Sequence, residues 1–213
     1  MPKLWILSLA AGLCYFATIP WQPFPGSIAL KGLSVSALAL IALRSPLDSR
    51  GRLLLTAALA LSSLGDILLD LDAAMFLFGL GAFLLAHLCY IQLFFAHRCK
   101  GQPLGAIRWI AVALLFLFSL GFTLWLLPSL GALSFPVMIY IGVLTGMVFT
   151  ATTWKAQRSD FIVFGAFLFL ISDAVLGAAK FHGPVPGRGW IVWGTYFAAQ
   201  VLIAAGVIRE LKR

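Results

Sequence analysis

The sequence predicts an all-α membrane protein with eight transmembrane helices and both termini in the cytoplasm. The chain of 213 residues is 62% hydrophobic and 10% charged, with a mean hydropathy of +1.03, whereas soluble domains carry about 25% charged residues. Its apolar residues form repeated stretches close to the ~20 residues that span a bilayer. Its basic residues lie in the short connections, and successive connections are alternately rich and poor in them, which is typical of a protein oriented in a membrane.

The first half of the chain contains four apolar stretches. The first imitates a signal peptide, but Leu13 before Cys14 is too large for a lipoprotein cleavage position and no A-x-A site follows. We therefore expect this stretch to be retained as a span. Connections rich in proline, glycine and charge separate it from the next three stretches. The predicted spans are residues 4–20, 27–43, 52–70 and 74–96.

The second half repeats this organisation, with breakers such as PSLG and HGPVPGRG between apolar stretches. No connection is long enough for a soluble domain, so we expect residues 1–213 to form a single integral membrane domain. For a bacterial protein, the inner membrane would hold it. The predicted spans are residues 106–127, 134–153, 160–180 and 189–209.

The distribution of basic residues tests this topology. Of the 15 lysines and arginines, the alternation of spans assigns only Lys31, Lys180 and Arg188 to one side. The positive-inside rule then places both termini in the cytoplasm and supports an even number of spans. The basic residues assigned to the cytoplasmic side are Lys3, Arg44, Arg50, Arg52, Arg98, Lys100, Arg108, Lys155, Arg158, Arg209, Lys212 and Arg213.

Composition also limits the partners. The net charge of +8 is spread over the connections, so it indicates a lipid bilayer and not nucleic acid. The three cysteines have no paired spacing, and His87, His97 and His182 fall at three different depths, so we expect no metal. Motifs for serine nucleophiles and nucleotide cofactors are absent from the sequence. We expect no cofactor and no obligate protein partner.

Two aspartates lie inside apolar stretches, Asp66 within residues 53–71 and Asp173 within 161–180. A carboxylate in hydrocarbon costs about 2.5–3.5 kcal/mol even on lenient scales, and such residues usually have a function, with a structural role as the main alternative. Asp66 lies ~21 Å along the third span from its cytoplasmic end at 1.5 Å per residue, which is in the outer half. Asp173 lies 13 residues past Asp160, at a similar depth.

Other polar residues are predicted at the same level of the membrane. The fourth and eighth spans carry polar side chains between their outer quarter and their middle, and a lysine lies near the outer end of the second and the seventh. A buried histidine can also be a packing residue, and a lysine near the interface can extend to the surface or bind a phosphate. These residues are His87, Tyr90, Tyr196, Gln200, Lys31 and Lys180.

The two halves of the chain are weakly similar. SSLGDILL of the third span pairs with FLISDAVL of the seventh, and HLCY of the fourth with GTYF of the eighth. Each half would contain four spans starting on the same side, which leaves a parallel 4+4 repeat open. Lys31 has no counterpart in the second half.

At these polar residues the sequence resembles the YhhN-like family of membrane proteins, whose characterised members are lysoplasmalogenases. The most specific matches are Gly65-Asp66, Ser172-Asp173, and Tyr196 with Gln200. The sequence departs from the family pattern at Gly32, where proline usually follows the lysine. The resemblance covers almost the whole chain, in residues 28–40, 62–69, 78–94, 169–181 and 194–206.

The resemblance implies hydrolysis of the vinyl ether of a lysoplasmalogen, a lysophospholipid, to a fatty aldehyde and glycerophospho-ethanolamine or -choline. Protonation of the β-carbon leaves an oxocarbenium ion that water attacks, which requires one carboxylic acid and one carboxylate. We assign Asp66 and Asp173 as this pair, without dividing the roles. The side chains expected to position water and the ether oxygen are His87, Tyr90, Tyr196 and Gln200, and those expected to bind the phosphate are Lys31 and Lys180.

Two other classes of function use the same residues. A proton-coupled transporter or flippase of a lysolipid or another amphiphile would use the aspartates as a proton relay. It predicts polar residues that continue to the cytoplasmic side, whereas the predicted polar set stops near mid-membrane. A structural or assembly subunit would use the aspartates for packing, and purified protein would then act on no lysolipid.

Overall fold

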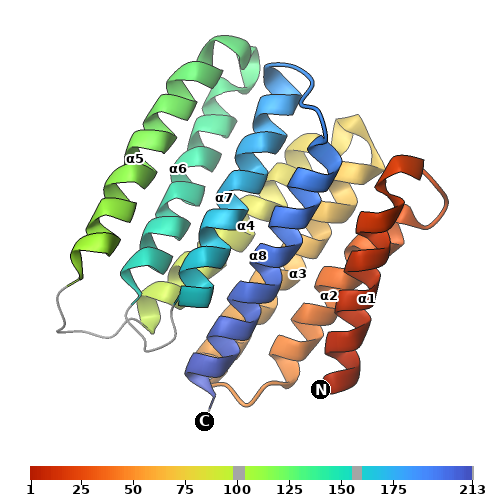
Figure 1. Ribbon diagram of the computed structural model, residues 1–213, viewed down its shortest axis with the longest axis vertical. Helices are drawn as coiled ribbons and strands as arrows, with labels where there is room; N and C mark the ends of the chain where they lie inside the picture. The colour runs from red at the N-terminus through yellow and green to blue at the C-terminus, as the bar shows by residue number, and fades with distance from the viewer. Residues whose placement is uncertain (98–103, 155–159, 213) are drawn as a thin grey trace.

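The chain folds into a bundle of helices that run side by side along one direction (Figure 1). This computed structural model describes residues 1–97, 104–154 and 160–212. Within these residues the regular structure is helical, and eight helices are long and apolar enough to cross a membrane. They are α1 (Pro2–Thr18), α2 (Ser27–Arg44), α3 (Ser49–Leu71), α4 (Phe76–Ala96), α5 (Ala106–Leu126), α6 (Ser134–Thr153), α7 (Asp160–Phe181) and α8 (Arg188–Leu211).

Short 3₁₀ helices extend α1, α4, α5 and α6 at the end of the bundle opposite the termini. They satisfy backbone groups that a helix end would otherwise leave unpaired. They are η1 (Ile19–Trp21), η2 (Ala73–Met75), η3 (Leu127–Ser129) and η4 (Gly131–Leu133).

The prediction of an all-α protein with eight membrane-spanning helices is confirmed in the described residues. Each predicted span coincides with one helix, and the largest difference is at the start of α3, predicted at residue 52 and observed at Ser49. Cys99 and some of the basic residues predicted on the cytoplasmic side lie outside the described residues. These basic residues are Arg98, Lys100, Lys155, Arg158 and Arg213.

Two helix starts depend on particular residues. Asp48 caps α3 because its carboxylate accepts a hydrogen bond from the Gly51 N–H at 3.2 Å. The other carboxylate oxygen lies 3.1 Å from His97 Nε2, which joins the start of α3 to the end of α4. Gly187 precedes α8 with φ +70°, a left-handed conformation that glycine adopts without steric cost.

The centre of the bundle is formed by α3, α4, α7 and α8. Figure 1 shows α5 and α6 at one edge, α1 and α2 at the other, and both termini at the same end. The most extensive packing joins α7 to α8 and α3 to α4, whereas α5 packs mainly on α6 and only lightly on α7. The central helices therefore carry Asp66, on α3, and Asp173, on α7.

Glycines allow the central helices to approach closely. At Gly165 of α7, an added Cβ would lie 3.0 Å from the carbonyl oxygen of Ala199 and 2.9 Å from Ile203 Cγ1, both on α8. At Gly65 of α3, it would lie 2.6 Å from the ring of Phe83 on α4. Small residues at such contacts are the usual basis of helix packing in membranes, where burial of apolar surface drives little association.

Gly165→Ala is expected to destabilise the protein by about 1–3 kcal/mol, the usual cost of overpacking. The physical reason is that the backbone of α8 must move away from the new methyl group. Thermal unfolding in detergent micelles measures the effect. Gly142→Ala on α6 is the matched control, because nothing lies within 4 Å of its added Cβ. Equal stability of the two variants would contradict the close α7–α8 contact.

Candidate active site

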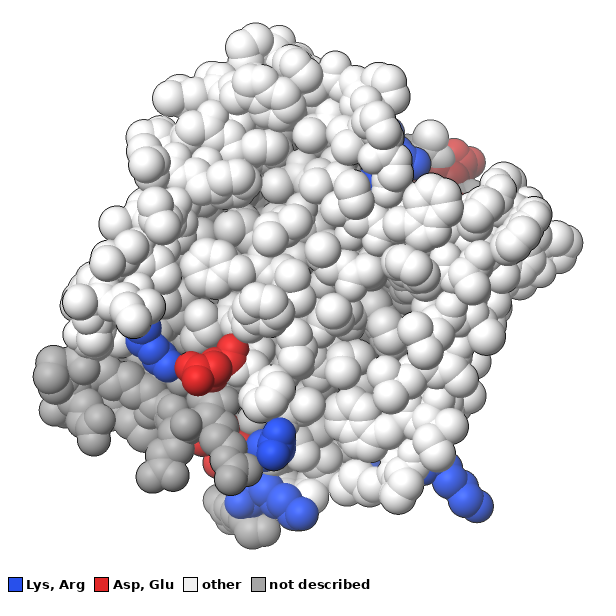
Figure 2. Space-filling view, viewed as in Figure 1, with Lys and Arg blue, Asp and Glu red and all other residues white. Residues whose placement is uncertain are grey.

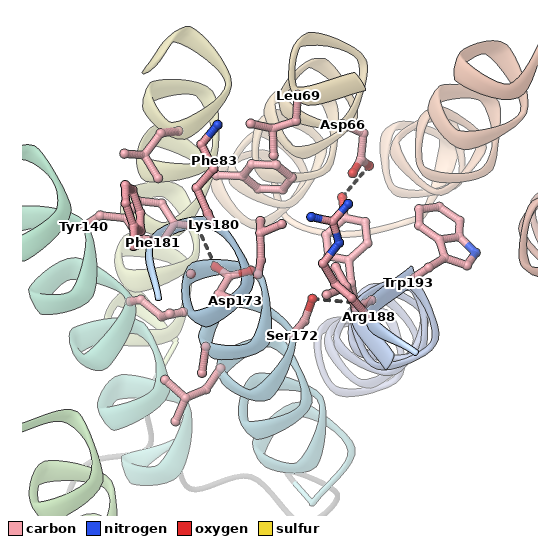
Figure 3. Close-up of a pocket in the computed structure, with 18 of the residues that line it drawn as sticks. Asp66, Leu69, Phe83, Tyr140, Ser172, Asp173, Lys180, Phe181, Arg188 and Trp193 are labelled. Carbon is pink, nitrogen blue, oxygen red and sulfur yellow. Dashed lines mark hydrogen bonds between the residues drawn. The ribbon is translucent and has the colours of Figure 1, made fainter. Parts of the chain in front are cut away.

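A cavity of about 320 Å³ lies among the helices. Its lining includes Gln22 and Gly189, which lie near the α1–α2 and α7–α8 connections, so the cavity is toward the end of the bundle opposite the termini. Both predicted aspartates line it. Figure 3 shows Asp66 and Asp173 on opposite sides of this space. The structure therefore brings to one cavity two carboxyl groups that are 107 positions apart in the sequence.

Asp66 is held by groups from two other helices. Its side chain, on α3, is buried, with the residue 2% exposed. The hydroxyl of Tyr196 on α8 donates a hydrogen bond to Oδ2 at 2.6 Å. Lys31 Nζ on α2 lies 3.9 Å from Oδ1. A buried carboxyl group thus has a hydrogen-bond donor on one oxygen and a cation near the other, which offsets its desolvation.

Lys31 is itself fixed by a second carboxylate. Its Nζ donates to Asp70 Oδ1 at 2.8 Å, and the Tyr15 hydroxyl donates to Asp70 Oδ2 at 3.1 Å. The Lys31 ammonium also lies over the rings of Tyr15 and Trp193, 5.8 and 6.0 Å from their centroids. We call Tyr15, Lys31, Asp66 and Asp70 the charged network. It orients the Lys31 ammonium toward Asp66, and the lysine does not extend freely to the surface.

Asp173 has a different environment. The hydroxyl of Tyr140 on α6 donates to its Oδ2 at 2.5 Å. The neighbouring Ser172 hydroxyl donates to the Val192 carbonyl at 3.0 Å, which fixes this turn of α7 against α8. Among the described residues, no ion pair within 4.0 Å is found for Asp173. Each aspartate is therefore paired with a tyrosine, but only Asp66 has a cation beside it.

Two exposed basic residues line the end of the cavity nearest the α7–α8 connection. Lys180 lies two turns beyond Asp173 on α7, with its Nζ 4.7 Å from the centroid of the Phe76 ring. Arg188 is the first residue of α8. Figure 3 shows its side chain on the same side of the cavity as Asp66 and Trp193. These two cations could hold an anionic group at the entrance.

His87, Tyr90 and Gln200 do not reach the cavity wall, which differs from the sequence-based expectation. His87 and Gln200 lie about one helical turn below the cavity lining and Tyr90 about two turns below it, and we call these three residues the deep layer. Tyr90 donates to Gln200 Oε1 at 2.6 Å, and the His87 ring packs 4.8 Å from Phe169 and 5.4 Å from Tyr140 between centroids.

Three aromatic rings separate the deep layer from the cavity. Phe83, Phe169 and Tyr196, which we call the aromatic floor, meet edge to face with centroids 5.2–6.2 Å apart. Phe83 and Tyr196 line the cavity, and His87 contacts Phe169 from the other side. The deep layer therefore meets the cavity through the aromatic floor and through Tyr140, which lines the cavity and also packs against His87.

Sequence reasoning missed several residues of the site. Tyr140 and Tyr15, which bond Asp173 and Asp70, carry little signal because single tyrosines are common in membrane helices. Asp70 lies in the last turn of α3, and its side chain is 29% exposed and pairs with Lys31. Within the described residues, no three His, Cys, Asp or Glu side chains are placed to hold a metal ion.

Comparison with known proteins places this geometry in context. The sequence model of the YhhN family matches residues 26–207. The chain is 35% identical over 224 residues to a Mycobacterium tuberculosis protein named lysoplasmalogenase, covering 95% of this chain and 82% of that protein. It is 33% identical over 158 residues to lysoplasmalogenase TMEM86B of Homo sapiens, covering 74% and 64%. No solved structure matches the chain.

Lys31→Met is expected to destabilise the fold by about 3–5 kcal/mol, because it leaves a buried carboxyl group without its cation. A second change, Asp66→Asn, should restore part of this loss, since it removes the group left unpaired. Thermal unfolding of the two single variants and the double variant in detergent micelles gives the coupling energy. Strictly additive effects would contradict an interaction between Lys31 and Asp66.

Proposed function

The chain belongs to the YhhN family, and from this premise we propose that it is a membrane-embedded lysoplasmalogenase. It would cleave the vinyl ether bond of alkenyl-glycerophospho-ethanolamine or -choline to a fatty aldehyde and a glycerophospho-alcohol. The relatives named lysoplasmalogenase support the substrate class. The observation that carries the chemistry is the pair of tyrosine-bonded aspartates that face one cavity.

Asp66 and Asp173 are the acid/base pair of this proposal. Vinyl ether hydrolysis needs a proton donor for the β-carbon and an acceptor for a proton of the attacking water. Tyr140 and Tyr196 hold the two carboxyl groups in orientation by hydrogen bonds of 2.5 and 2.6 Å. Lys31 acts as a counter-ion to Asp66, and His87, Tyr90 and Gln200 support the aromatic floor from behind.

The phosphate of the substrate would bind at the outer end of the cavity. Lys180 and Arg188 are exposed there and line the cavity, and an arginine can hold two phosphate oxygens at once. Lys31 suits this role less well, because its ammonium group already forms an ion pair with Asp70 Oδ1 at 2.8 Å. The phosphate site of the proposal therefore pairs Lys180 with Arg188.

The packing below the cavity favours an enzyme over a transporter. The aromatic floor and then the deep layer lie between the cavity and the end of the bundle that carries the termini. A relay across the membrane would need polar groups beyond the deep layer, where Phe94 and Trp154 pack edge to face. A cavity with an apolar inner end retains a substrate for chemistry.

We infer that both termini are cytoplasmic and that the cavity faces the outer leaflet. Figure 2 shows a broad uncharged band on the visible face, with most of the lysines and arginines at the end where the termini lie. The positive-inside rule supports this orientation. In a bacterium the membrane would be the inner membrane.

Asp66→Asn and Asp173→Asn are each expected to lower aldehyde release from lysoplasmalogen by about a hundredfold or more, the usual contribution of a general acid or base. Purified protein in detergent, with aldehyde detected directly, provides the measurement. Asp72→Asn is the control, because Asp72 caps η2 outside the cavity lining. Activity within tenfold of wild type in both cavity variants would overturn the catalytic assignment.

The orientation has its own test. In a chain with Cys14, Cys89 and Cys99 replaced by serine, Pro184→Cys should react with a membrane-impermeant maleimide in intact cells. Lys212→Cys should react only after the membrane is permeabilised, because it lies at the opposite end. The reverse labelling pattern would show that the termini are outside.

A further inference from the structure

The cavity has a polar side and an apolar side, and the two aspartates lie on different sides. Asp66 belongs to the charged network. Asp173 borders an apolar region between α5, α6 and α7, which we call the apolar arm. Figure 3 shows Tyr140 and Phe181 beside Asp173, and Arg188 and Trp193 beside Asp66. The arm is lined by Phe118, Phe122, Ile141, Leu144, Leu170 and Gly177.

Resting on the vinyl ether hydrolysis proposed above, we propose that the apolar arm binds the hydrocarbon chain of the substrate. This orientation makes Asp173 the proton donor and Asp66 the carboxylate that activates water. The ligand is a linear hydrocarbon chain joined to a polar phosphate-bearing headgroup, and the apolar arm and the entrance cations receive its two ends.

The hydrocarbon chain of the substrate is favoured in the arm because the rest of the cavity offers it little apolar surface. A methylene chain gains free energy when apolar side chains replace water around it. Beside Lys31 and Asp70 it would instead displace water from charged groups, which is unfavourable. α5 packs only lightly on α7, and Phe118 both lines the arm and is 44% exposed on the bundle surface. The arm therefore extends to the lipid-facing surface.

Gly177 sets the width of the arm at the α5–α7 contact. A Cβ added there would lie 3.8 Å from both Phe122 and Leu126 of α5, which is ordinary van der Waals contact. An alanine is thus accommodated, whereas a longer side chain occupies the space between the helices. Glycine at this position keeps that space open for the hydrocarbon chain of the substrate.

The orientation of the hydrocarbon chain assigns the roles of the two aspartates. In a vinyl ether the β-carbon carries the hydrocarbon chain, and the α-carbon carries the oxygen that leads to the glycerol. With the chain in the arm, the β-carbon lies toward Asp173 and the α-carbon toward Asp66. Lys31 Nζ, 3.9 Å from Asp66 Oδ1, stabilises negative charge on that carboxylate. Both observations give the same division of roles.

With these roles, every proton and electron pair of the hydrolysis is accounted for. The Asp173 carboxyl proton bonds to the β-carbon through the electron pair of the double bond, which leaves an oxocarbenium ion at the α-carbon. Water attacks the α-carbon while Asp66 takes its proton, giving a hemiacetal. The bond from this carbon to the glycerol oxygen breaks as Asp66 returns the proton to that oxygen. Asp173 regains a proton from the hemiacetal hydroxyl, and the aldehyde forms.

A chain-length series tests the arm. Gly177→Leu should lower kcat/KM for a sixteen-carbon alkenyl lysophospholipid by about tenfold or more, equivalent to about 1.4 kcal/mol. For an eight-carbon homologue the loss should be smaller than about threefold, because a short chain does not fill the arm. Gly121→Leu on α5 is the matched control, since Gly121 is exposed and its added Cβ meets nothing within 4 Å. It should leave both substrates unchanged.

Two results would overturn the arm as the chain site. One is a Gly177→Leu profile equal to that of Gly121→Leu, and the other is an equal loss for both chain lengths. If wild-type protein releases aldehyde from no vinyl ether, the proposed reaction fails. The arm is then tested separately by the Kd of saturated alkyl ether lysophospholipids of the same two lengths, with the same expected pattern.

A cationic analogue tests the roles of the aspartates without turnover. A lysophospholipid with a protonated secondary amine in place of the ether oxygen carries the charge of the oxocarbenium ion. The analogue takes no proton from Asp173, so it binds the protein with Asp66 as the carboxylate and Asp173 as the acid. Asp66→Asn should therefore raise its Kd by about tenfold or more, whereas Asp173→Asn should change it less than about threefold, because asparagine has the shape of a protonated carboxyl group. An equal or larger effect of Asp173→Asn would reverse the assignment.

Discussion

The burial of the Asp66 carboxyl group inside an apolar helix is the constraint on which the site depends. A buried ionisable group is costly unless other polar groups satisfy it. The required groups come from α8, through Tyr196, and from α2, through Lys31. Lys31 then brings in Asp70 and the Tyr15 hydroxyl of α1. Helices α2 and α8 therefore supply the groups that lower the cost of burying Asp66, and α1 is joined to them through Asp70.

Asp173 places a similar requirement on the other half of the bundle, but the solution is simpler. It takes a tyrosine hydroxyl from α6, and Ser172 bonds α7 to α8 one residue away. The difference between the two sites is the cation. This asymmetry matters for chemistry, because an acid/base pair needs two carboxyl groups in unlike surroundings.

The cavity combines these acids with the two kinds of surface that an amphipathic lipid presents. Lys31, Asp66, Asp70 and Arg188 lie on the side of α2, α3 and α8. Apolar side chains line the space between α5, α6 and α7, which Asp173 borders, and Lys180 of α7 lies near the cavity entrance. The vinyl ether is the bond at which a lysoplasmalogen changes from polar to apolar. A molecule that matches both surfaces would place this bond between Asp66 and Asp173. The match of the lipid to the two surfaces and the positions of the two aspartates thus place the vinyl ether at the same point of the cavity.

Many features of this protein could be predicted from the sequence because they depend only on residue type and on the order of residues along the chain. A span needs about 20 apolar residues, and basic residues mark one side, so eight helices and their approximate ends follow from order alone. Asp66 and Asp173 could be identified because charges are rare in such segments. Their similar depth follows from the rise per residue of a helix.

Only the tertiary structure decided which polar groups meet. Depth along a helix does not specify a neighbour, because rotation of one helix against the next determines the contact. His87, Tyr90 and Gln200 were expected beside the aspartates, but Phe83 and Phe169 pack between them and the cavity. Tyr140 became part of the site because α6 turns its hydroxyl to Asp173. Sequence determined which residues are costly in a membrane, and packing determined which partners relieve that cost.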